Sequence, residues 1–140
     1  MATVLVGAGE VAARVITAMD SSGEEVVLVT RHERDAEEFA LAFPRTIVLH
    51  GDARDPGVLR QAHADSAKSL VALTDDDAAN LSVCLLAREA FHIPLVAGLV
   101  GHPQNARVFH ALGIPCISCT EIVADGVMTA LSPSTVVEVR

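Results

Sequence analysis

The fold is decided by the first residues of the chain, Thr3-Val4-Leu5-Val6-Gly7-Ala8-Gly9-Glu10-Val11-Ala12. An apolar run meets the pattern Gly-x-Gly-x-x-Ala, which opens a stretch with helical spacing. Gly7 permits a tight turn, Gly9 lets the backbone approach a phosphate, and Ala12 lets the helix pack closely on a sheet. Free N–H groups at the helix N-terminus attract phosphate. The strand–turn–helix context favours a dinucleotide-binding turn, and the alternative is a structural turn that binds nothing.

The composition is typical of one compact α/β domain. The chain has 140 residues, of which 51% are hydrophobic and only 3% aromatic, with no Trp and no Tyr. The core must therefore consist of Val, Leu, Ile and Ala, a bias that suits strands buried on both faces of a parallel sheet. The length predicts a single domain with a substantial core.

Short apolar runs alternate with helical stretches along the whole chain. We expect strands at 3–6, 25–29, 46–49, 69–73, 95–99 and 116–117, and helices at 11–19, 31–43, 55–62, 77–91, 103–112 and 120–131. Such alternation produces a parallel sheet through right-handed crossovers. The sequence therefore predicts a Rossmann-like, doubly wound parallel α/β sheet of about six strands with helices on both faces.

The domain is expected to span residues 1–133. Ser132-Pro133 marks the one plausible edge, and residues 134–140 form a C-terminal tail or domain edge. Within this tail, residues 136–139 have the apolar pattern of a further strand.

Charge and cysteine content restrict the partners and the compartment. The formal net charge is −8, whereas duplex nucleic acid and anionic membranes both require a basic face. No apolar run reaches membrane-spanning length, and the first residues lack the basic flank of a signal peptide. Three cysteines are too few for a disulfide framework and suggest reduced thiols in a cytosol. We expect a cytoplasmic protein with no nucleic-acid partner and no direct membrane insertion.

The end of the second strand bears on the choice of nucleotide. Proteins that bind NAD usually carry an acidic residue there, about 20 residues after the glycine turn, which binds the ribose 2′-hydroxyl. Thr30 and Arg31 occupy this place. Neither repels a 2′-phosphate, and Arg31 and Arg34 are able to pair with one. The alternative is that Arg31 is a solvated surface charge.

Several motifs further along the chain have the spacing of a known family. They are His50-Gly51-Asp52-Ala53 with Asp55-Pro56 and Leu59, Leu73-Thr74-Asp75-Asp76-Asp77 with Asn80, His102-Pro103, Leu112-Gly113-Ile114 and Glu121-Ile122-Val123-Ala124. From about residue 4 to about residue 131 the chain resembles the RCK family (regulator of conductance of potassium), also called the TrkA N-terminal or KTN domain.

The resemblance implies a cytoplasmic regulator without catalytic activity that controls a potassium channel or transporter. Such domains bind NAD(H), ATP or ADP, and sometimes other nucleotides. In this chain, Thr30 and Arg31 are also compatible with NADP(H). Domains of this family form homodimers and often larger rings, so the protein is expected at the inner membrane only through a membrane partner.

The resemblance also implies which residues form the pocket. Asp52 suits contact with adenine, because a carboxylate accepts a hydrogen bond from an exocyclic amine. The implied set is Gly7, Gly9, Glu10 and Val11 at phosphate, Thr30 and Arg31 at the ribose, Asp52 and Ala53 at adenine, and Thr74 and Asp75 across the mouth.

The chain departs from the family pattern at two positions. Thr30 replaces the acidic residue, and Gly98 stands where the family often places an Arg, so a charged contact from that position is absent. Both departures concern the identity of the ligand more than the fold.

Two clusters have more than one interpretation. Cys116-Ile117-Ser118-Cys119 has the spacing of a redox or metal pair, but only three cysteines exist and Cys116 falls in an apolar strand. Two small residues at a strand end are therefore preferred over metal or redox chemistry. The run Asp75-Asp76-Asp77 suggests a divalent cation or a helix cap, and capping is favoured where a helix begins.

Two other functions are alternatives to a nucleotide sensor. An NADP(H)-dependent oxidoreductase fragment would need a Tyr-x-x-x-Lys pair or a substrate domain, whereas the chain has no Tyr and one Lys, Lys68. A dimerisation module without ligand is the second. The stretch 120–131 is too apolar to stay exposed and predicts a homodimer. Its apolar residues are Ile122, Val123, Val127, Met128 and Leu131.

Overall fold

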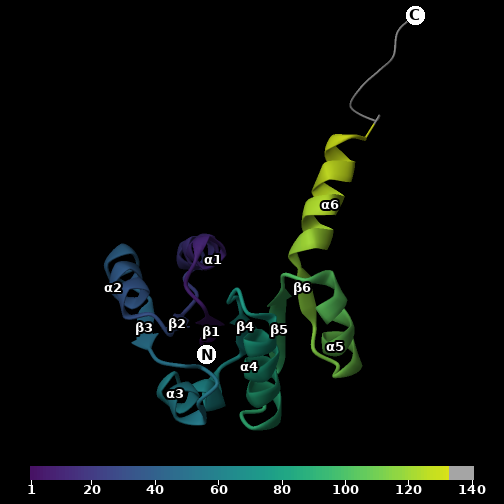
Figure 1. The fold of residues 1–140 in the computed structure, drawn as a ribbon. Helices are drawn as coiled ribbons and strands as arrows, with labels where there is room; N and C mark the ends of the chain where they lie inside the picture. The colour runs from purple at the N-terminus through teal and green to yellow at the C-terminus, as the bar shows by residue number, and fades with distance from the viewer. Residues whose placement is uncertain (133–140) are drawn as a thin grey trace, which may run out of the picture.

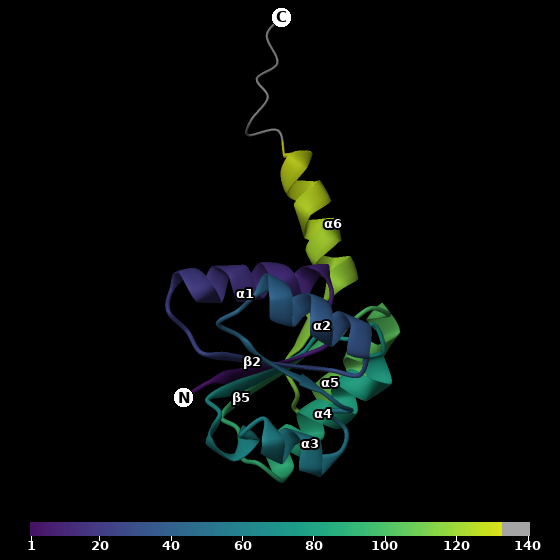
Figure 2. The same ribbon diagram turned by 90° about the vertical axis from the view of Figure 1, so that its left-hand side faces the viewer.

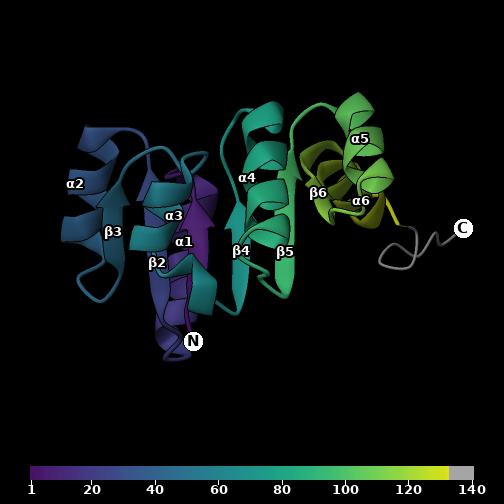
Figure 3. The ribbon, with the colours of Figure 1, turned by 90° about the horizontal axis from the view of Figure 1, so that it is seen from below.

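The computed structural model describes residues 1–132. Six parallel strands form one sheet in the order β3-β2-β1-β4-β5-β6 (Figures 1 and 3). This arrangement confirms the predicted Rossmann-like sheet. The tail 134–140 and its expected strand at 136–139 lie outside the described residues. The strands are β1 (Thr3–Val6), β2 (Val26–Thr30), β3 (Ile47–His50), β4 (Ser69–Ala72), β5 (Leu95–Val100) and β6 (Cys116–Ser118).

Helices cover both faces of the sheet, as predicted (Figure 2). One face is covered by α1 (Glu10–Ser21) and α2 (Glu33–Ala42), and the other by α3 (Pro56–Gln61), α4 (Asp77–Glu89) and α5 (Ala106–Ala111). Two short 3-10 turns, η1 (Ala64–Ser66) and η2 (Pro103–Asn105), lie in the connections, and α6 (Cys119–Ala130) follows β6.

The central strand β1 divides the core into two apolar layers. Leu5 packs with Ala12 and Ile16 of α1, while Val4 and Val6 face the layer beneath α3, α4 and α5. Val4, Leu5 and Val6 are all buried. This alternation is the period of two that a strand requires, and it fixes the glycine turn at the carboxyl end of the central strand.

The start of α2 differs from the sequence prediction in a way that matters for the pocket. The helix was expected from Arg31, but it begins at Glu33. His32 is the extended N-cap residue, with φ −104° and ψ 117°, and Thr30 is still the last residue of β2. Arg31 therefore lies in a turn at the carboxyl edge of the sheet, where helix geometry does not direct its side chain.

The helix expected at 103–112 is also different, because it is divided. Pro103 opens the 3-10 turn η2, in which the N–H of Asn105 donates to the carbonyl of His102 at 2.9 Å, and α5 begins only at Ala106. Pro103 lacks an N–H and favours the first turn of a helix. The tighter first turn results from bonds of Asn105 that sequence periodicity does not reveal.

The last helix leaves the body of the domain (Figure 1). None of its residues is buried, and Met128 and Leu131 are 67% and 70% exposed. Within residues 1–132, no helix has both the length and the apolarity to cross a membrane.

Candidate functional site

A pocket of about 570 Å³ opens at the carboxyl ends of the central strands. It lies where the strand order reverses, between β1 and β4, which is where ligands bind in open α/β sheets. Most of the predicted site residues line it. The lining comprises Val6, Gly7, Ala8, Gly9, Val29, Thr30, Arg31, His32, Asp35, Gly51, Asp52, Ala53, Arg54, Leu73, Thr74, Asp75, Asp76, Ala79 and Val83.

Glu10 and Val11 are the predicted residues that do not line the pocket. The Val11 side chain is 50% exposed, and Glu10 lines a separate shallow groove on the outer side of α1. Both residues begin α1, so what they present toward the pocket is limited to backbone N–H groups. Their predicted place at a phosphate is compatible with the structure only through the backbone.

The two glycines of the turn have different structural tasks. Gly7 has φ +102°, and a Cβ on it would lie 2.9 Å from the backbone N of Thr74. Gly7 is thus required for the close contact between the β1 and β4 turns. A Cβ on Gly9 would meet nothing within 4 Å. Gly9 is the N-cap of α1 without a side-chain cap bond, so the first N–H groups of α1 are left for water or an anion.

A buried amide holds the opposite wall of the pocket. Asn80 is 0% exposed and lies beneath the β4–α4 turn. Its Oδ1 accepts hydrogen bonds from the Thr74 hydroxyl at 2.6 Å and the Thr74 N–H at 3.1 Å. Its Nδ2 donates to the carbonyls of Thr74 and Leu99, at 3.0 and 2.9 Å. Asn80 therefore fixes Thr74 at the mouth and joins the turn to β5.

The three consecutive aspartates are placed in three different environments. Asp75 lines the pocket. Asp76 caps α4, because its Oδ1 accepts from the N–H of Ala79 at 3.0 Å, as the capping interpretation predicted. Asp77 is the first residue of α4 and does not cap it. Among residues 1–132, no group of three or more His, Cys, Asp or Glu side chains is arranged to hold a metal ion.

Asp77 binds the loop after β5. Its Oδ1 accepts from the N–H of Gly101 at 2.8 Å, and its Oδ2 accepts from the N–H of His102 at 3.0 Å and from Asn105 Nδ2 at 2.8 Å. Burial opposes ionisation of Asp77, but these hydrogen bonds outweigh it and lower its pKa. Because the charged carboxylate holds this loop, Asp77 accounts for the tight turn η2.

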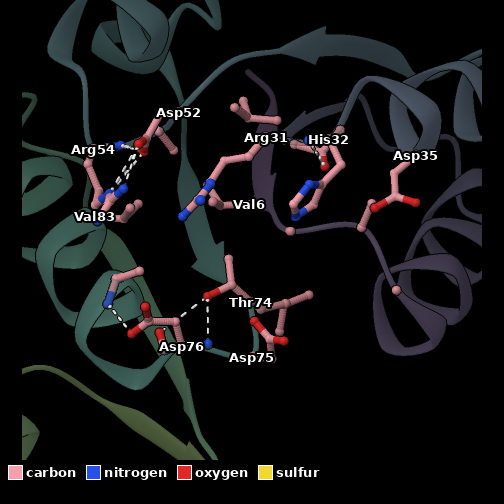
Figure 4. A pocket seen from close by; sticks show the side chains of 18 of the residues that line it. Val6, Arg31, His32, Asp35, Asp52, Arg54, Thr74, Asp75, Asp76 and Val83 are labelled. Atoms are coloured by element: carbon pink, nitrogen blue, oxygen red, sulfur yellow. Dashed lines mark hydrogen bonds and ion pairs between the residues drawn. The ribbon is translucent and has the colours of Figure 1, made fainter.

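The rim formed by the β3–α3 turn carries an ion pair. The backbone N–H and Nε of Arg54 donate to Oδ1 of Asp52 at 3.0 and 3.1 Å, and Nη2 donates to Oδ2 at 2.7 Å (Figure 4). These hydrogen bonds lower the pKa of Asp52 to about 2, against the opposing effect of burial. The predicted contact of Asp52 with an adenine amine would have to compete with Arg54.

The turn before α2 forms the facing rim. Thr30 is 3% exposed, and its hydroxyl accepts from the N–H of His32 at 3.4 Å. His50 Nε2 lies 3.0 Å from the carbonyl oxygen of Arg31. The Arg31 side chain extends toward the centre of the pocket (Figure 4). Arg34, which was expected to bind a 2′-phosphate together with Arg31, does not line the pocket.

Sequence reasoning missed some of the charged lining. Asp35, in the first turn of α2, and Arg54, two residues after Asp52, both line the pocket. The helix start at Glu33 carries Asp35 to the rim, and only the corrected helix boundary reveals this. Arg54 lies in a short loop, where no periodicity indicates the direction of a side chain. The other lining residues not singled out by the sequence analysis include His32 and Asp76.

Gly98 and the cysteines, which the sequence also singles out, do not line the pocket. A Cβ on Gly98 would lie 2.7 Å from Cε2 of Phe109, so a side chain there would enter the apolar layer under α5 and not the pocket. Cys84, Cys116 and Cys119 are free thiols. Burial raises the pKa of Cys116, and that of Cys84 to about 12, which lowers their thiolate content at neutral pH.

Comparison with protein families places most of the chain in one of them. The model of the TrkA-N domain matches residues 3–120. The Trk system potassium uptake protein TrkA of Streptomyces coelicolor is 28% identical over 134 residues, and a TrkA homolog of Methanothermobacter thermautotrophicus is 30% identical over 131. The matches cover 96% and 94% of this chain but 60% of each relative.

Solved structures share the fold at low identity. The TrkA-N domain of the inner membrane protein ybaL from Escherichia coli superposes with a TM-score of 0.85 at 15% identity, covering 94% of this chain and 96% of that one. The GsuK channel bound to NAD gives 0.74 at 20% identity, covering 83% of this chain and 21% of the channel. The AMP-bound Kef CTD of Shewanella denitrificans gives 0.78 at 18%, covering 97% and 85%.

Proposed function

The chain belongs to the TrkA-N domain family, and from this premise we propose that it is a cytoplasmic regulatory domain that binds an adenine nucleotide and controls potassium transport through a membrane partner. The relatives that match along most of the chain are potassium uptake proteins. Domains of the same fold have been solved with NAD and with AMP, and the GsuK channel with ADP. The membrane partner is a potassium channel or transporter, and the domain reaches the membrane through it.

The observation that carries this proposal is the pocket at the β1/β4 switch point. The uncapped N-terminus of α1, with open space above Gly9, is suited to receive the phosphates. The ribose then lies at Thr30 and Arg31, and the base against the β3–α3 turn. The proposed set is the one implied by the sequence: Gly7, Gly9, Glu10 and Val11 through their backbone, with Thr30, Arg31, Asp52, Ala53, Thr74 and Asp75.

We assign the domain a regulatory and not a catalytic role. Two buried polar side chains behind the pocket wall, Asn80 and Asp77, are used in holding the β4–α4 turn and the loop after β5. These bonds link the pocket wall to β5 and to the segment before α5. A ligand that moves Thr74 would thus act on the half of the domain that carries α6.

Calorimetry with NAD(H), NADP(H), ATP and ADP tests the proposal. Gly9→Asp places a carboxylate where a phosphate is expected, and the same side chain caps α1. Binding should fall by about a hundredfold or more through repulsion and loss of the free N–H groups, while thermal stability is retained. Ser21→Asp, which adds the same charge at the other end of α1, is the control. Absence of binding by the unmodified protein at millimolar nucleotide would refute the sensor function.

We also propose that the protein pairs through α6 as a homodimer or a larger ring. Ile122, Val123 and Val127 are more than half exposed, as are Met128 and Leu131, and such a surface is unusual for a monomer. Light scattering should show at least a dimer at micromolar concentration, and Met128→Glu should dissociate it. The control Thr129→Glu adds the same charge at the neighbouring position. A monomeric unmodified protein would contradict this assembly.

A further inference from the structure

We propose that Arg31 and Arg54 together form a receptor for a second phosphate, carried on the ribose 2′-oxygen of an adenine nucleotide such as NADP(H). The inference rests on the proposed function, because it names the ligand class of the same pocket. The two guanidinium groups come from neighbouring strand ends. Arg31 follows β2 and Arg54 follows β3, and these strands are paired with Thr30 opposite His50.

The guanidinium groups of Arg31 and Arg54 both act on the carboxylate of Asp52. Arg54 is bound to Asp52, and Arg31 is close enough to contribute to the low pKa of that same carboxyl group. The Arg31 side chain projects into the pocket between Asp52 and His32 (Figure 4). A ligand whose base lies at the β3–α3 turn would therefore have its ribose close to both guanidinium groups.

The bonding of Asp52 explains why this end of the pocket offers donors. Oδ1 accepts from the N–H and Nε of Arg54, and Oδ2 accepts from Nε and Nη2. A carboxylate has about four acceptor positions, so Arg54 leaves it little capacity for an adenine amine. Asp52 acts as a positioning residue for Arg54. Within residues 1–132, the hydrogen bonds of Arg54 use Nε, Nη2 and the backbone N–H but not Nη1.

Phosphate is the ligand group that fits two guanidinium groups best. Planar guanidinium donates paired hydrogen bonds to phosphate oxygens and keeps its charge at all relevant pH values. Thr30, at the strand end, is neutral and holds the N–H of His32, so no carboxylate repels an anion at that position. A 2′-phosphate would lie at this strand end, in the place of the hydroxyl that an acidic residue binds in NAD-specific proteins.

Three carboxylates of the pocket lining besides Asp52 oppose this arrangement. Asp75 and Asp76 follow β4, with Asp76 close enough to act on the charge of Arg54, and the third is Asp35. It lines the pocket from the first turn of α2, on the far side of His32 from Arg54 (Figure 4). A carboxylate there repels a 2′-phosphate and is able to accept a hydrogen bond from a ribose hydroxyl instead. The ligand preference is thus decided between the Arg31–Arg54 pair and Asp35, and variants of these residues separate the two outcomes.

The experiment compares ligands that differ only in the extra phosphate, with the full chain in the calorimeter. The pairs are NAD⁺ with NADP⁺, and 5′-AMP with 2′,5′-ADP; 3′,5′-ADP reports whether the position of the phosphate matters. The 2′-phosphate should tighten binding by about tenfold or more. Arg31→Ala and Arg54→Ala should each remove most of that gain and weaken NAD⁺ much less. Arg34→Ala makes the same charge change outside the pocket and should keep the gain in affinity from the 2′-phosphate.

A second variant at the β3–α3 turn guards against a folding defect. Arg54→Lys keeps the charge but loses the paired donors. It should therefore keep thermal stability and retain only part of the gain in affinity from the 2′-phosphate. Equal affinity for NAD⁺ and NADP⁺, or equal losses for both in the arginine variants, would overturn the receptor. Weaker NAD⁺ binding in Asp35→Asn would assign the ribose contact to Asp35 instead. Binding of NAD⁺ without gain from the phosphate overturns only this inference, whereas no binding of any nucleotide overturns the proposed function as well.

Discussion

The two ends of the pocket are built by different means. At the end proposed to bind phosphate (the phosphate end), Gly7 contacts the backbone of Thr74, and Asn80, 0% exposed, bonds both that turn and β5. At the end proposed to bind the ribose (the ribose end), the walls are charged side chains: Asp52 and Arg54 are 41% and 46% exposed in their side chains. One end is fixed by the close packing of the fold, and the other by groups that solvent also reaches.

The difference teaches where the ligand class is encoded. Removing a buried hydrogen-bonding group costs about 1–3 kcal/mol for each partner left unpaired, whereas an exposed ion pair contributes about 0–1 kcal/mol. Changes at Gly7 or Asn80 should therefore cost stability as well as altering the pocket. The ribose end is able to exchange Arg31 or Arg54 at small cost, so it is there that we expect nucleotide preference to change.

The largest effect is expected at Asn80. Asn80→Ala leaves the N–H and carbonyl of Thr74 and the carbonyl of Leu99 without their partner. We expect a loss of about 4 kcal/mol in the free energy of unfolding, since water replaces only some of these bonds. Urea denaturation measures it, and Asn80→Asp should lose at least as much, because its buried carboxylate would face the carbonyl oxygens of Thr74 and Leu99. A cost below about 1 kcal/mol would show that the turn is held by other contacts.

The next largest effect is expected at Gly7, and it is specific to that glycine. Gly7→Ala would force a residue with a Cβ to φ +102° and press it on Thr74 N. Strain and overpacking each cost about 1–3 kcal/mol, so we expect a loss of about 3 kcal/mol. Gly9→Ala, where the added Cβ meets nothing within 4 Å, should change the free energy of unfolding by less than about 1 kcal/mol. Equal effects in the two variants would contradict the division of tasks within the turn.

The sequence predicted the geometry around the glycine turn well, because it follows from backbone chemistry. Buried apolar strands, Gly7 and Gly9 have local signatures, and they gave the sheet, the turn and the position of the pocket. The cap at Asp76 was predicted by the general preference of helix starts for acidic residues.

The ribose end was predicted only in part, because its geometry depends on loops. The direction of Arg31 follows from a helix that begins two residues later than its amphipathic pattern suggested. Asp52 was expected to contact the adenine ring, although Arg54, two residues away, occupies its carboxylate oxygens. Asp77 was grouped with Asp76 as a cap, yet its partners are on the loop after β5, 24 to 28 residues away. Sequence periodicity carries no information about such contacts.

A smaller effect, on ligand choice, is expected from Thr30→Asp. The carboxylate would accept from a ribose hydroxyl and repel a 2′-phosphate, so the ratio of NAD(H) to NADP(H) affinity should rise by about tenfold. Thr30 is 3% exposed, and some stability should be lost because a buried carboxylate is costly. Thr30→Asn is the neutral control, and calorimetry with both nucleotides gives the ratio. An unchanged ratio would mean that the end of β2 does not contact the ribose.

The smallest effect is the pH dependence of the Asp52–Arg54 pair. Arg54 lowers the pKa of Asp52 from its ordinary value of 3.8 to about 2. A carboxyl group with a lowered pKa in the folded state stabilises that state above its unfolded pKa, and the stabilisation is lost as pH falls through the folded pKa. The contribution of this pair should therefore be complete above about pH 5 and vanish between about pH 4 and pH 2.

Because both side chains are more than a third exposed, solvent screening keeps that contribution small. The measurement is the difference in free energy of unfolding between the unmodified protein and Arg54→Ala from pH 6 to pH 2. Asp77 also has a lowered pKa, but its effect is common to both proteins and cancels in the difference. The difference should shrink toward acid pH and should also shrink with added salt. If it stays constant across this range, Arg54 stabilises the turn by packing and not by its charge, and the exposed end of the pocket is less electrostatic than its residues indicate.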